Sequence, residues 1–215
     1  MTWKYVLHSA RYQWAMGFCL AMILMMVLYM PTYYEEIIQP RPGATFDDAF
    51  LNIMLPAVDW SVAIFVILYA SLIHTIYASI RNPNAVVIAL TTYCAVNLIR
   101  MGTMYSLILE PPPGMILLVD PIATFLVYPD SHFAKDLFFS GHVSSMMAMV
   151  LVETNQKIKY LKIFGTVAVG VFLAWQHVHY TLDLVVAPFV TYGVFVVIQR
   201  VVERPYEVKK PTING

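Results

Sequence analysis

Long apolar runs dominate this chain and constrain its fold more than any other feature. A bilayer core of roughly 30 Å is crossed by a helix of about 20 apolar residues, or fewer where flanking side chains reach the interface. Six runs meet this length, the fourth being short but continuous: 14–30, 60–78, 85–109, 137–152, 160–176 and 180–198. Because a backbone in lipid must satisfy its own hydrogen bonds, each run predicts a helix. The sequence therefore predicts an all-α polytopic membrane protein, a six-transmembrane-helix bundle that forms a single integral membrane domain over residues 1–215.

Composition excludes several other classes of protein. The chain is 60% hydrophobic and 12% charged, whereas soluble domains are about 45–50% apolar and 25% charged. Thirteen Lys and Arg balance thirteen Asp and Glu, so the basic footprint of a nucleic-acid binder is missing. Cys19 and Cys94 both lie inside apolar runs, and His177 with His179 lacks an evident third ligand. We therefore expect no disulfide framework, no metal site and no cofactor.

Charge placement predicts the orientation. Six spans put both termini on one side, and ten of the thirteen basic residues fall on that side: Lys4, Arg11, Arg81, Lys157, Lys159, Lys162, Arg200, Arg204, Lys209 and Lys210. The other side has only Arg41, Arg100 and Lys135, together with ten of the thirteen acidic residues. The positive-inside rule therefore predicts cytoplasmic termini. Between the third and fourth spans, the apolar segment 115–127 is broken by Asp120-Pro121 and suits an interfacial or re-entrant piece.

Arg100 is the clearest case of an ionisable residue inside a predicted span. Arg100 lies about nine residues short of the outward end of the third span, roughly 13 Å below the rim. A charge near the bilayer centre costs about 2.5–3.5 kcal/mol on insertion scales, so its presence indicates a function. The alternative is a structural ion pair with a carboxylate from a neighbouring helix, such as Asp183 or Asp136.

Two histidine motifs stand at the outward mouths of the fourth and sixth spans. Ser140-Gly141-His142 begins one of them, and His179 is followed four residues later by Asp183 in the other. On a helix that spacing places both side chains on one face, where a carboxylate orients an imidazole and raises its basicity. The alternative interpretation of the second motif is a helix-capping pair. Since the topology puts both motifs and Arg100 on one side of the membrane, we expect them to form one site.

These residues resemble the sphingomyelin synthase family, a branch of the type 2 phosphatidic acid phosphatase superfamily. Residues 136–142 (D-L-F-F-S-G-H) are similar to that family's D-Y-L-F-S-G-H, and residues 179–183 (H-Y-T-L-D) to its H-Y-T-I-D. Residues 100–105 (R-M-G-T-M-Y), followed by the prolines at 111–113, resemble its R-x-x-T-M-Y and L-P-x-P elements. Residues 39–47 weakly resemble its first luminal loop.

The resemblance implies a lipid phosphotransferase that moves phosphocholine or phosphoethanolamine from a glycerophospholipid to ceramide or a similar lipid alcohol. His179 would be the nucleophile that forms a phosphohistidine, Asp183 would orient it, and His142 would serve as general acid and then base. The partners implied are a phospholipid donor and a ceramide-like acceptor.

The residues alone supply the parts that such chemistry requires. Arg100 offers positive charge to a phosphate, and Ser140 and the Gly141 backbone lie where a helix begins, a position that donates to phosphate. The phosphatases of the superfamily carry a K-x6-R-P element and an arginine six residues before the nucleophile, where this chain has Leu173. A single buried arginine matches the single charge of a phosphodiester better than a phosphomonoester.

Head-group contacts remain open at this stage. Aromatic faces would suit choline, carboxylates would suit a primary ammonium, and the candidates of both kinds are Tyr105, Asp136, Phe139, Tyr180 and Glu110. A hydrolase with the same His/His/Asp site, either a phospholipase C-like enzyme or a lipid phosphatase, is the alternative function, and a non-enzymatic transporter is a third. The compact length favours a bacterial inner-membrane enzyme with a periplasmic site over a Golgi or plasma-membrane one; oligomeric state is left open.

Overall fold

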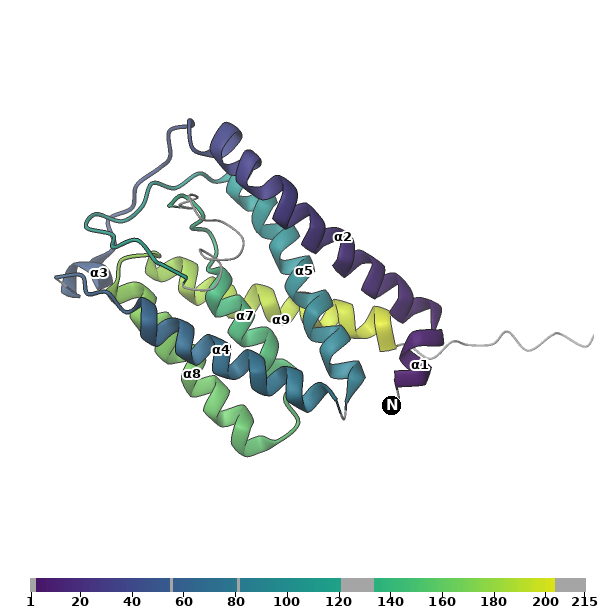
Figure 1. The fold of residues 1–215 in the computed structure, drawn as a ribbon. Helices are drawn as coiled ribbons and strands as arrows, with labels where there is room; N and C mark the ends of the chain where they lie inside the picture. The colour runs from purple at the N-terminus through teal and green to yellow at the C-terminus, as the bar shows by residue number, and fades with distance from the viewer. Residues whose placement is uncertain (1–2, 55, 81, 121–133, 204–215) are drawn as a thin grey trace, which may run out of the picture.

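A computed structural model describes residues 3–54, 56–80, 82–120 and 134–203, and every regular element in those ranges is helical (Figure 1). The elements are α1 (Trp3–His8), α2 (Ala10–Thr32), the π-helix η1 (Tyr33–Ile38), α3 (Ala49–Ile53), α4 (Ser61–Ser79), α5 (Pro83–Ser106), α7 (Gly141–Leu151), α8 (Gln156–Trp175) and α9 (Thr181–Glu203). One isolated β-bridge joins Ala44 to Leu109. The all-α prediction is confirmed.

Five helices are long and apolar enough to cross a membrane, which indicates a multi-pass membrane protein. They are α2 continued by η1 (Ala10–Ile38), α4, α5, α8 and α9. The predicted fourth span, 137–152, is helical only as α7, whose 11 residues extend about 16 Å, less than the hydrocarbon thickness. Six spans and cytoplasmic termini therefore stay predictions. Among the residues used to predict orientation, Arg81, Arg204, Lys209 and Lys210 lie outside the described ranges, as does 121–127 of the expected re-entrant piece.

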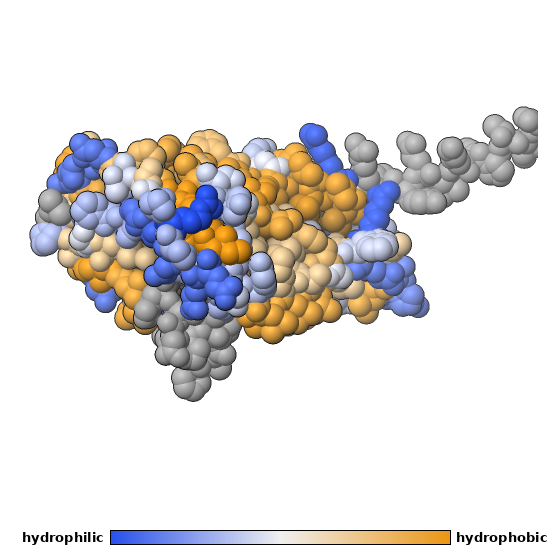
Figure 2. Space-filling model, turned by 90° about the horizontal axis from the view of Figure 1, so that it is seen from above, coloured by the Kyte–Doolittle hydropathy of each residue, from blue (hydrophilic) through white to orange (hydrophobic). Residues whose placement is uncertain are grey.

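The outer surface of the bundle is apolar where lipid would cover it. Large side chains such as Trp14, Val62 and Phe189 are 81%, 77% and 73% exposed, an arrangement that is unfavourable in water. In Figure 2 the hydrophilic residues gather toward the two ends of the molecule, and hydrophobic residues fill the space between them. This pattern is typical of a protein whose middle faces hydrocarbon.

Short helix α7 lies at the centre of the bundle and packs against α4, α5, α8 and α9 (Figure 1). Its Met146 is fully buried, in one cluster with Val96 of α5, Val169 of α8 and Ala187 of α9. Because protein surrounds α7, a helix that is too short to cross a membrane can be buried here. The start of α7, at the fully buried Ser140, therefore lies inside the bundle.

Local sequence explains where the helices begin. Pro83 occupies the first turn of α5, where a missing N–H costs nothing. The Asn155 side chain accepts hydrogen bonds from Lys157 N at 3.0 Å and Ile158 N at 3.4 Å and so caps α8. Pro31 lies within α2, and the helix continues beyond it as the π-helix η1, which extends it eight residues past the predicted end at residue 30.

Candidate functional site

Arg100 is buried within α5 and is held by three acceptors. Its Nε donates to the Phe139 carbonyl at 2.9 Å, Nη1 donates to Asn97 Oδ1 at 3.1 Å, and Nη2 donates to Asp136 Oδ2 at 2.6 Å. The residue is 9% exposed. The alternative ion pair with Asp136 is thus present. Two of the five guanidinium N–H groups make no hydrogen bond to the described residues, so the ion pair leaves donors for a ligand.

Gly141 lets α7 begin against this guanidinium. A Cβ at position 141 would lie 2.6 Å from Arg100 Cζ and 3.0 Å from Nη2, closer than real Cβ atoms approach other atoms. The absence of a side chain therefore permits the contact between the first turn of α7 and Arg100. The need for glycine at position 141 is a consequence of this packing, and it could not be inferred from the sequence motif alone.

Ser140 caps α7 and joins it to the second histidine motif. Its Oγ accepts from Val143 N at 3.5 Å, and its own amide donates to the Asp183 carbonyl at 3.2 Å. Ser140 is completely buried. The predicted helix start at Gly141 is confirmed, and the two motifs are connected through their backbones.

His179 and Asp183 face each other, although not on one helix. His179 Nδ1 lies 3.6 Å from Asp183 Oδ2, and the two side chains are 3% and 1% exposed. Since α9 begins at Thr181, His179 precedes the helix, and the expected shared helical face is wrong. Asp183 Oδ2 also accepts from Tyr180 N at 3.1 Å, a capping bond. The carboxylate therefore both faces the imidazole and secures the turn that carries it.

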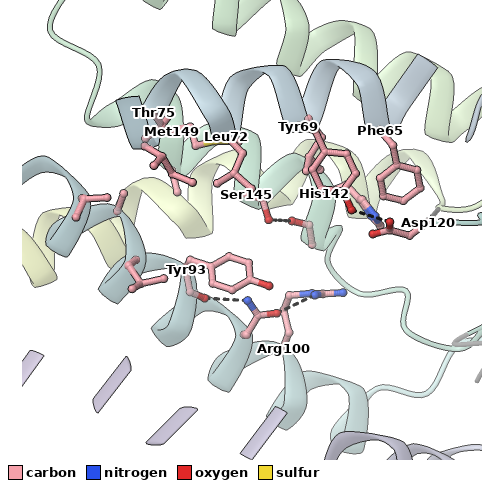
Figure 3. A pocket seen from close by; sticks show the side chains of 18 of the residues that line it. Phe65, Tyr69, Leu72, Thr75, Tyr93, Arg100, Asp120, His142, Ser145 and Met149 are labelled. Carbon is pink, nitrogen blue, oxygen red and sulfur yellow. Dashed lines mark hydrogen bonds between the residues drawn. The ribbon is translucent and has the colours of Figure 1, made fainter. Parts of the chain in front are cut away.

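His142 lines a cavity of about 610 Å³ between α4, α5 and α7 (Figure 3). Its ring meets Phe65 edge-to-face at 5.6 Å between centroids, and Arg100 lines the same cavity. One end of the cavity is polar and includes Tyr69, Asn97, Arg100, Asp120, Asp136 and His142. The other end is apolar and includes Leu72, Ile76, Val86, Leu90 and Met149. The cavity therefore has the polarity pattern of a lipid.

Several predicted site residues lie beside this cavity and do not line it. His179 and Asp183 are buried and face each other, Ser140 caps α7, and Phe139 contributes its carbonyl to Arg100 while its ring packs in the core. A ligand in the cavity would meet His142, Gly141 and Arg100 directly. His179 is not among the residues that line the cavity.

The other head-group candidates lie elsewhere. Tyr105 is 54% exposed and packs under the Arg41 guanidinium at 4.8 Å. Glu110 pairs with Lys135 at 2.8 Å, and the hydrogen bond from Lys135 lowers the pKa of that carboxyl. Tyr180 donates its hydroxyl to the Glu110 carbonyl at 3.1 Å. Asp136 is the one member of this candidate group that lines the cavity.

Asp48, in the loop before α3, secures the second histidine motif. Its Oδ2 accepts from Thr181 N at 2.7 Å, and its Oδ1 accepts from Thr181 Oγ1 at 3.0 Å and from Phe50 N at 3.0 Å. Burial opposes ionisation, but these hydrogen bonds outweigh it and lower the pKa of Asp48. The first turn of α9 is thus capped by a residue 133 positions away.

Further residues that line the cavity were not predicted, among them Tyr69, Tyr93, Asn97 and Asp120. Asn97 orients Arg100, Tyr69 donates to Asp120 Oδ1 at 2.6 Å, and Tyr93 lines the wall beside them (Figure 3). Asn97 could have been found, because it precedes Arg100 by three residues and so shares its helical face. The Tyr69–Asp120 pair had no sequence signal, since it joins two separate segments.

Metal-ligand geometry is not evident in the part of the chain that the structure describes, where no cluster of three or more His, Cys, Asp or Glu side chains could hold an ion. His177 Nδ1 donates to the Pro113 carbonyl at 2.9 Å. In comparisons with known proteins, no family model, no curated protein and no solved structure matches the chain.

Proposed function

We propose that this protein transfers a phosphorylated head group, phosphocholine or phosphoethanolamine, from a glycerophospholipid to ceramide or a similar lipid alcohol. The observation that carries the proposal is that Arg100 and His142 line the polar end of one cavity, while the buried His179–Asp183 pair is joined to the start of α7 by the hydrogen bond from the Ser140 amide to the Asp183 carbonyl. These groups supply a phosphate anchor, an acid–base residue and an oriented nucleophile. The motif resemblance to sphingomyelin synthases supports the same chemistry.

Charge supports a phosphodiester as the substrate. Asp136 already pairs with Arg100, so the net positive charge left for a ligand is small. A phosphodiester brings one negative charge, whereas a phosphomonoester brings about 1.5 to 2. The two uncommitted N–H groups of Arg100 can donate to one or both non-bridging oxygens of a phosphodiester. A phosphatidic-acid-like substrate would add more negative charge than these groups compensate.

The reaction balances with the residues named. His179 Nδ1 faces Asp183, which leaves Nε2 to attack phosphorus. The N–P bond forms as the P–O bond to diacylglycerol breaks, and protonated His142 gives its proton to the leaving oxygen. The acceptor hydroxyl then returns a proton to His142, attacks phosphorus, and releases His179 as the N–P bond breaks. Both histidines end the cycle in their starting states.

The shape of the cavity favours a lipid acceptor. Its wall on α5 runs from Val86 to Arg100, about 21 Å at 1.5 Å per residue, which exceeds one bilayer leaflet of roughly 15 Å. An acyl chain fits along such a wall, and a bound lipid would displace water from it. By the positive-inside rule the reacting end would face away from the cytoplasm, in a bacterium toward the periplasm.

Hydrolysis is the second candidate, favoured by one observation. His142 is partly exposed, so water can take the position of the acceptor hydroxyl. Purified protein supplied with labelled phosphatidylcholine or phosphatidylethanolamine, with and without ceramide, separates the two functions. Transfer predicts a labelled sphingolipid that forms only with ceramide; release of labelled head group at the same rate without ceramide identifies a hydrolase.

The assignment of the nucleophile is tested separately. Protein mixed with labelled donor lipid and denatured at alkaline pH, where the P–N bond of a phosphohistidine persists, should carry its label on His179, and His179→Ala should abolish both label and turnover. His177→Ala is the matched control, because His177 is equally buried but bonds Pro113. Label found on His142 would reverse the two histidine roles, and full turnover in both His179→Ala and His142→Ala would exclude catalysis at this site.

A further inference from the structure

The cavity that holds Arg100 and His142 extends well beyond the reacting end. Helices α4, α5 and α7 form its walls, and Figure 3 shows Thr75 and Met149 at the end away from Arg100 and His142. Apolar side chains line the walls between the two ends: Leu68, Leu72, Leu90 and Ala148. The cavity is therefore a long apolar slot with one polar end.

Three buried side chains, one from each wall, form what we call the floor of the slot: Thr75 of α4, Ala89 of α5 and Met149 of α7. The Thr75 hydroxyl accepts a hydrogen bond from Lys162 Nζ at 2.9 Å. Lys162 in turn pairs with Glu153 at 2.8 Å, and both side chains are buried. An apolar chain could extend past Thr75 only by separating this ion pair, which is strongly unfavourable in a protein interior. The floor therefore gives the slot a fixed length.

The size of the slot matches one acyl chain. Ala89 and Arg100 are eleven residues apart on α5, about 16 Å at 1.5 Å per residue, which is close to one leaflet of roughly 15 Å. The volume of about 610 Å³ equals about 20 water volumes of roughly 30 Å³ each. Since a two-chain phospholipid has far more non-hydrogen atoms than this, the slot admits one chain and excludes the other.

The second chain of a bound lipid has a path out of the slot. Leu72 and Ile76 of α4 and Leu90 of α5 line the slot, yet they are 39%, 55% and 40% exposed. The slot thus opens sideways, between α4 and α5, onto the surface that hydrocarbon would cover. A lipid bound by one chain can keep its other chain in the bilayer through this opening.

We infer that the floor selects the lipid substrate by the length of a single acyl chain. The inference rests on the proposed function, which places the phosphate at Arg100. With the phosphate held there, the methyl end of the chain reaches the floor at one length. A shorter chain leaves a void beside Met149, and a longer one must bend or draw the phosphate away from Arg100. Thr75, Ala89 and Met149 are therefore specificity-determining residues that act far from the reacting atoms.

The experiment measures which chain length the protein binds in detergent. Equal amounts of one-chain lysophospholipids with lauroyl, myristoyl, palmitoyl and stearoyl chains are mixed, once with choline and once with ethanolamine head groups, and bound lipids are counted by native mass spectrometry. The His179→Ala protein serves as the parent, so that no lipid is consumed. One length should dominate, since each methylene that loses its packing lowers the affinity about four-fold.

Substitutions in the floor should move the preferred length in opposite directions. Ala89→Phe fills the far end and should change the bound ratio of adjacent members of the series about 15-fold toward the shorter chain, because these members differ by two methylenes. Met149→Ala enlarges the far end and should favour the longer chain by a similar factor. A variant that merely loosened the fold would not reverse direction in this way.

Matched controls lie on the same walls but outside the slot. Ala70→Phe, at an exposed position of α4, and Met147→Ala, on α7, change residues that do not line the slot, and both should keep the parent's preference. The same lipids, offered as donors with ceramide to protein that retains His179, separate this inference from the proposed function. A shift in bound length without any transfer would support the floor and refute the transferase. Transfer with one chain preference in all variants, shifts of Ala89→Phe and Met149→Ala in the same direction, or no binding of one-chain lipids would overturn the floor.

Discussion

The amide of Ser140 donates a hydrogen bond of 3.2 Å to the carbonyl oxygen of Asp183. This bond joins the N-cap of α7 to the first turn of α9 and so connects the two histidine motifs. His142 follows Ser140 by two residues, and His179 precedes Asp183 by four. Backbone contact therefore determines the relative position of two imidazoles whose side chains make no hydrogen bond to each other.

Replacing Gly141 with alanine should disrupt the site without removing any functional group. The new Cβ would lie 2.6 Å from Arg100 Cζ, which forces either α7 or the guanidinium to move. Overpacking of this kind costs about 1–3 kcal/mol, and we expect a lower Tm and loss of most activity. A Cβ at Gly102, on the same helix as Arg100, would have nothing within 4 Å, so Gly102→Ala should leave activity unchanged and should not lower Tm, because alanine is favoured over glycine inside a helix. Wild-type activity in Gly141→Ala would show that Arg100 can move without consequence.

Arg100→Lys should separate charge from geometry. Lysine keeps a positive charge for Asp136 but cannot reproduce the three directed bonds to Asp136, Asn97 and Phe139. Removing one directed donor to a reacting oxyanion lowers kcat about 10²-fold, and we expect a loss of that size in head-group transfer. Circular dichroism should remain unchanged, because the ion pair persists.

Arg41→Lys is the control for this substitution, since Arg41 stacks on Tyr105 at the surface. It should leave transfer unaffected. If Arg100→Lys also retained full kcat, Arg100 would be a structural ion-pair residue alone, and phosphate binding would have to be assigned elsewhere.

The lengths of the apolar runs were sufficient to locate the helices, but they did not show whether lipid or protein surrounds each helix. The runs at 60–78 and 180–198 correspond to α4 and α9 within a few residues at each end. The run at 137–152 contains only an 11-residue helix. The segment before that helix instead provides acceptors for Arg100, namely the Asp136 carboxylate and the Phe139 carbonyl. Hydropathy reports that a segment is buried, and cannot distinguish lipid from protein as its surroundings.

The site was predictable where short motifs contained its residues. The Arg100–Asp136 pair was anticipated as an alternative, and His179 and Asp183 do face each other, although not through the shared helical face that their spacing predicted. Asp48 and the Tyr69–Asp120 pair were missed because they depend on contacts between distant segments. Tyr105 followed the motif in sequence, yet its position near the end of α5 turns it toward Arg41, away from the cavity.

Asp48→Ala should destabilise the protein in a pH-dependent way. The pKa of Asp48 is lowered in the folded protein, so its contribution is complete above the unfolded pKa near 3.9 and disappears as the pH falls through the folded value. Loss of a helix cap costs about 0.5–2 kcal/mol. The Tm difference between wild type and variant should therefore be full at pH 7 and smaller near pH 3.

The control for this prediction is Asp47→Ala. Asp47 accepts only from the Asn52 side chain, at an exposed position, and should shift Tm less. A Tm difference for Asp48→Ala that stays constant from pH 7 to pH 3 would contradict the assignment of its carboxylate as the cap of α9. An unchanged Tm at both pH values would contradict it as well.

A buried ion pair contacts the wall of the cavity at the end away from Arg100 and His142. Lys162 Nζ lies 2.8 Å from Glu153 Oε2 and donates to Thr75 Oγ1 at 2.9 Å, and Thr75 lines the cavity. Removing one partner from a buried pair costs about 3–5 kcal/mol, whereas replacing both with apolar residues is often neutral. We expect Glu153→Leu and Lys162→Met each to lower Tm strongly, and the double variant to recover most of the loss. Lys157→Met, exposed on the same helix as Lys162, is the control and should leave Tm unchanged. Additive losses in the double variant, measured as a double-mutant cycle on Tm, would show that the two side chains act independently.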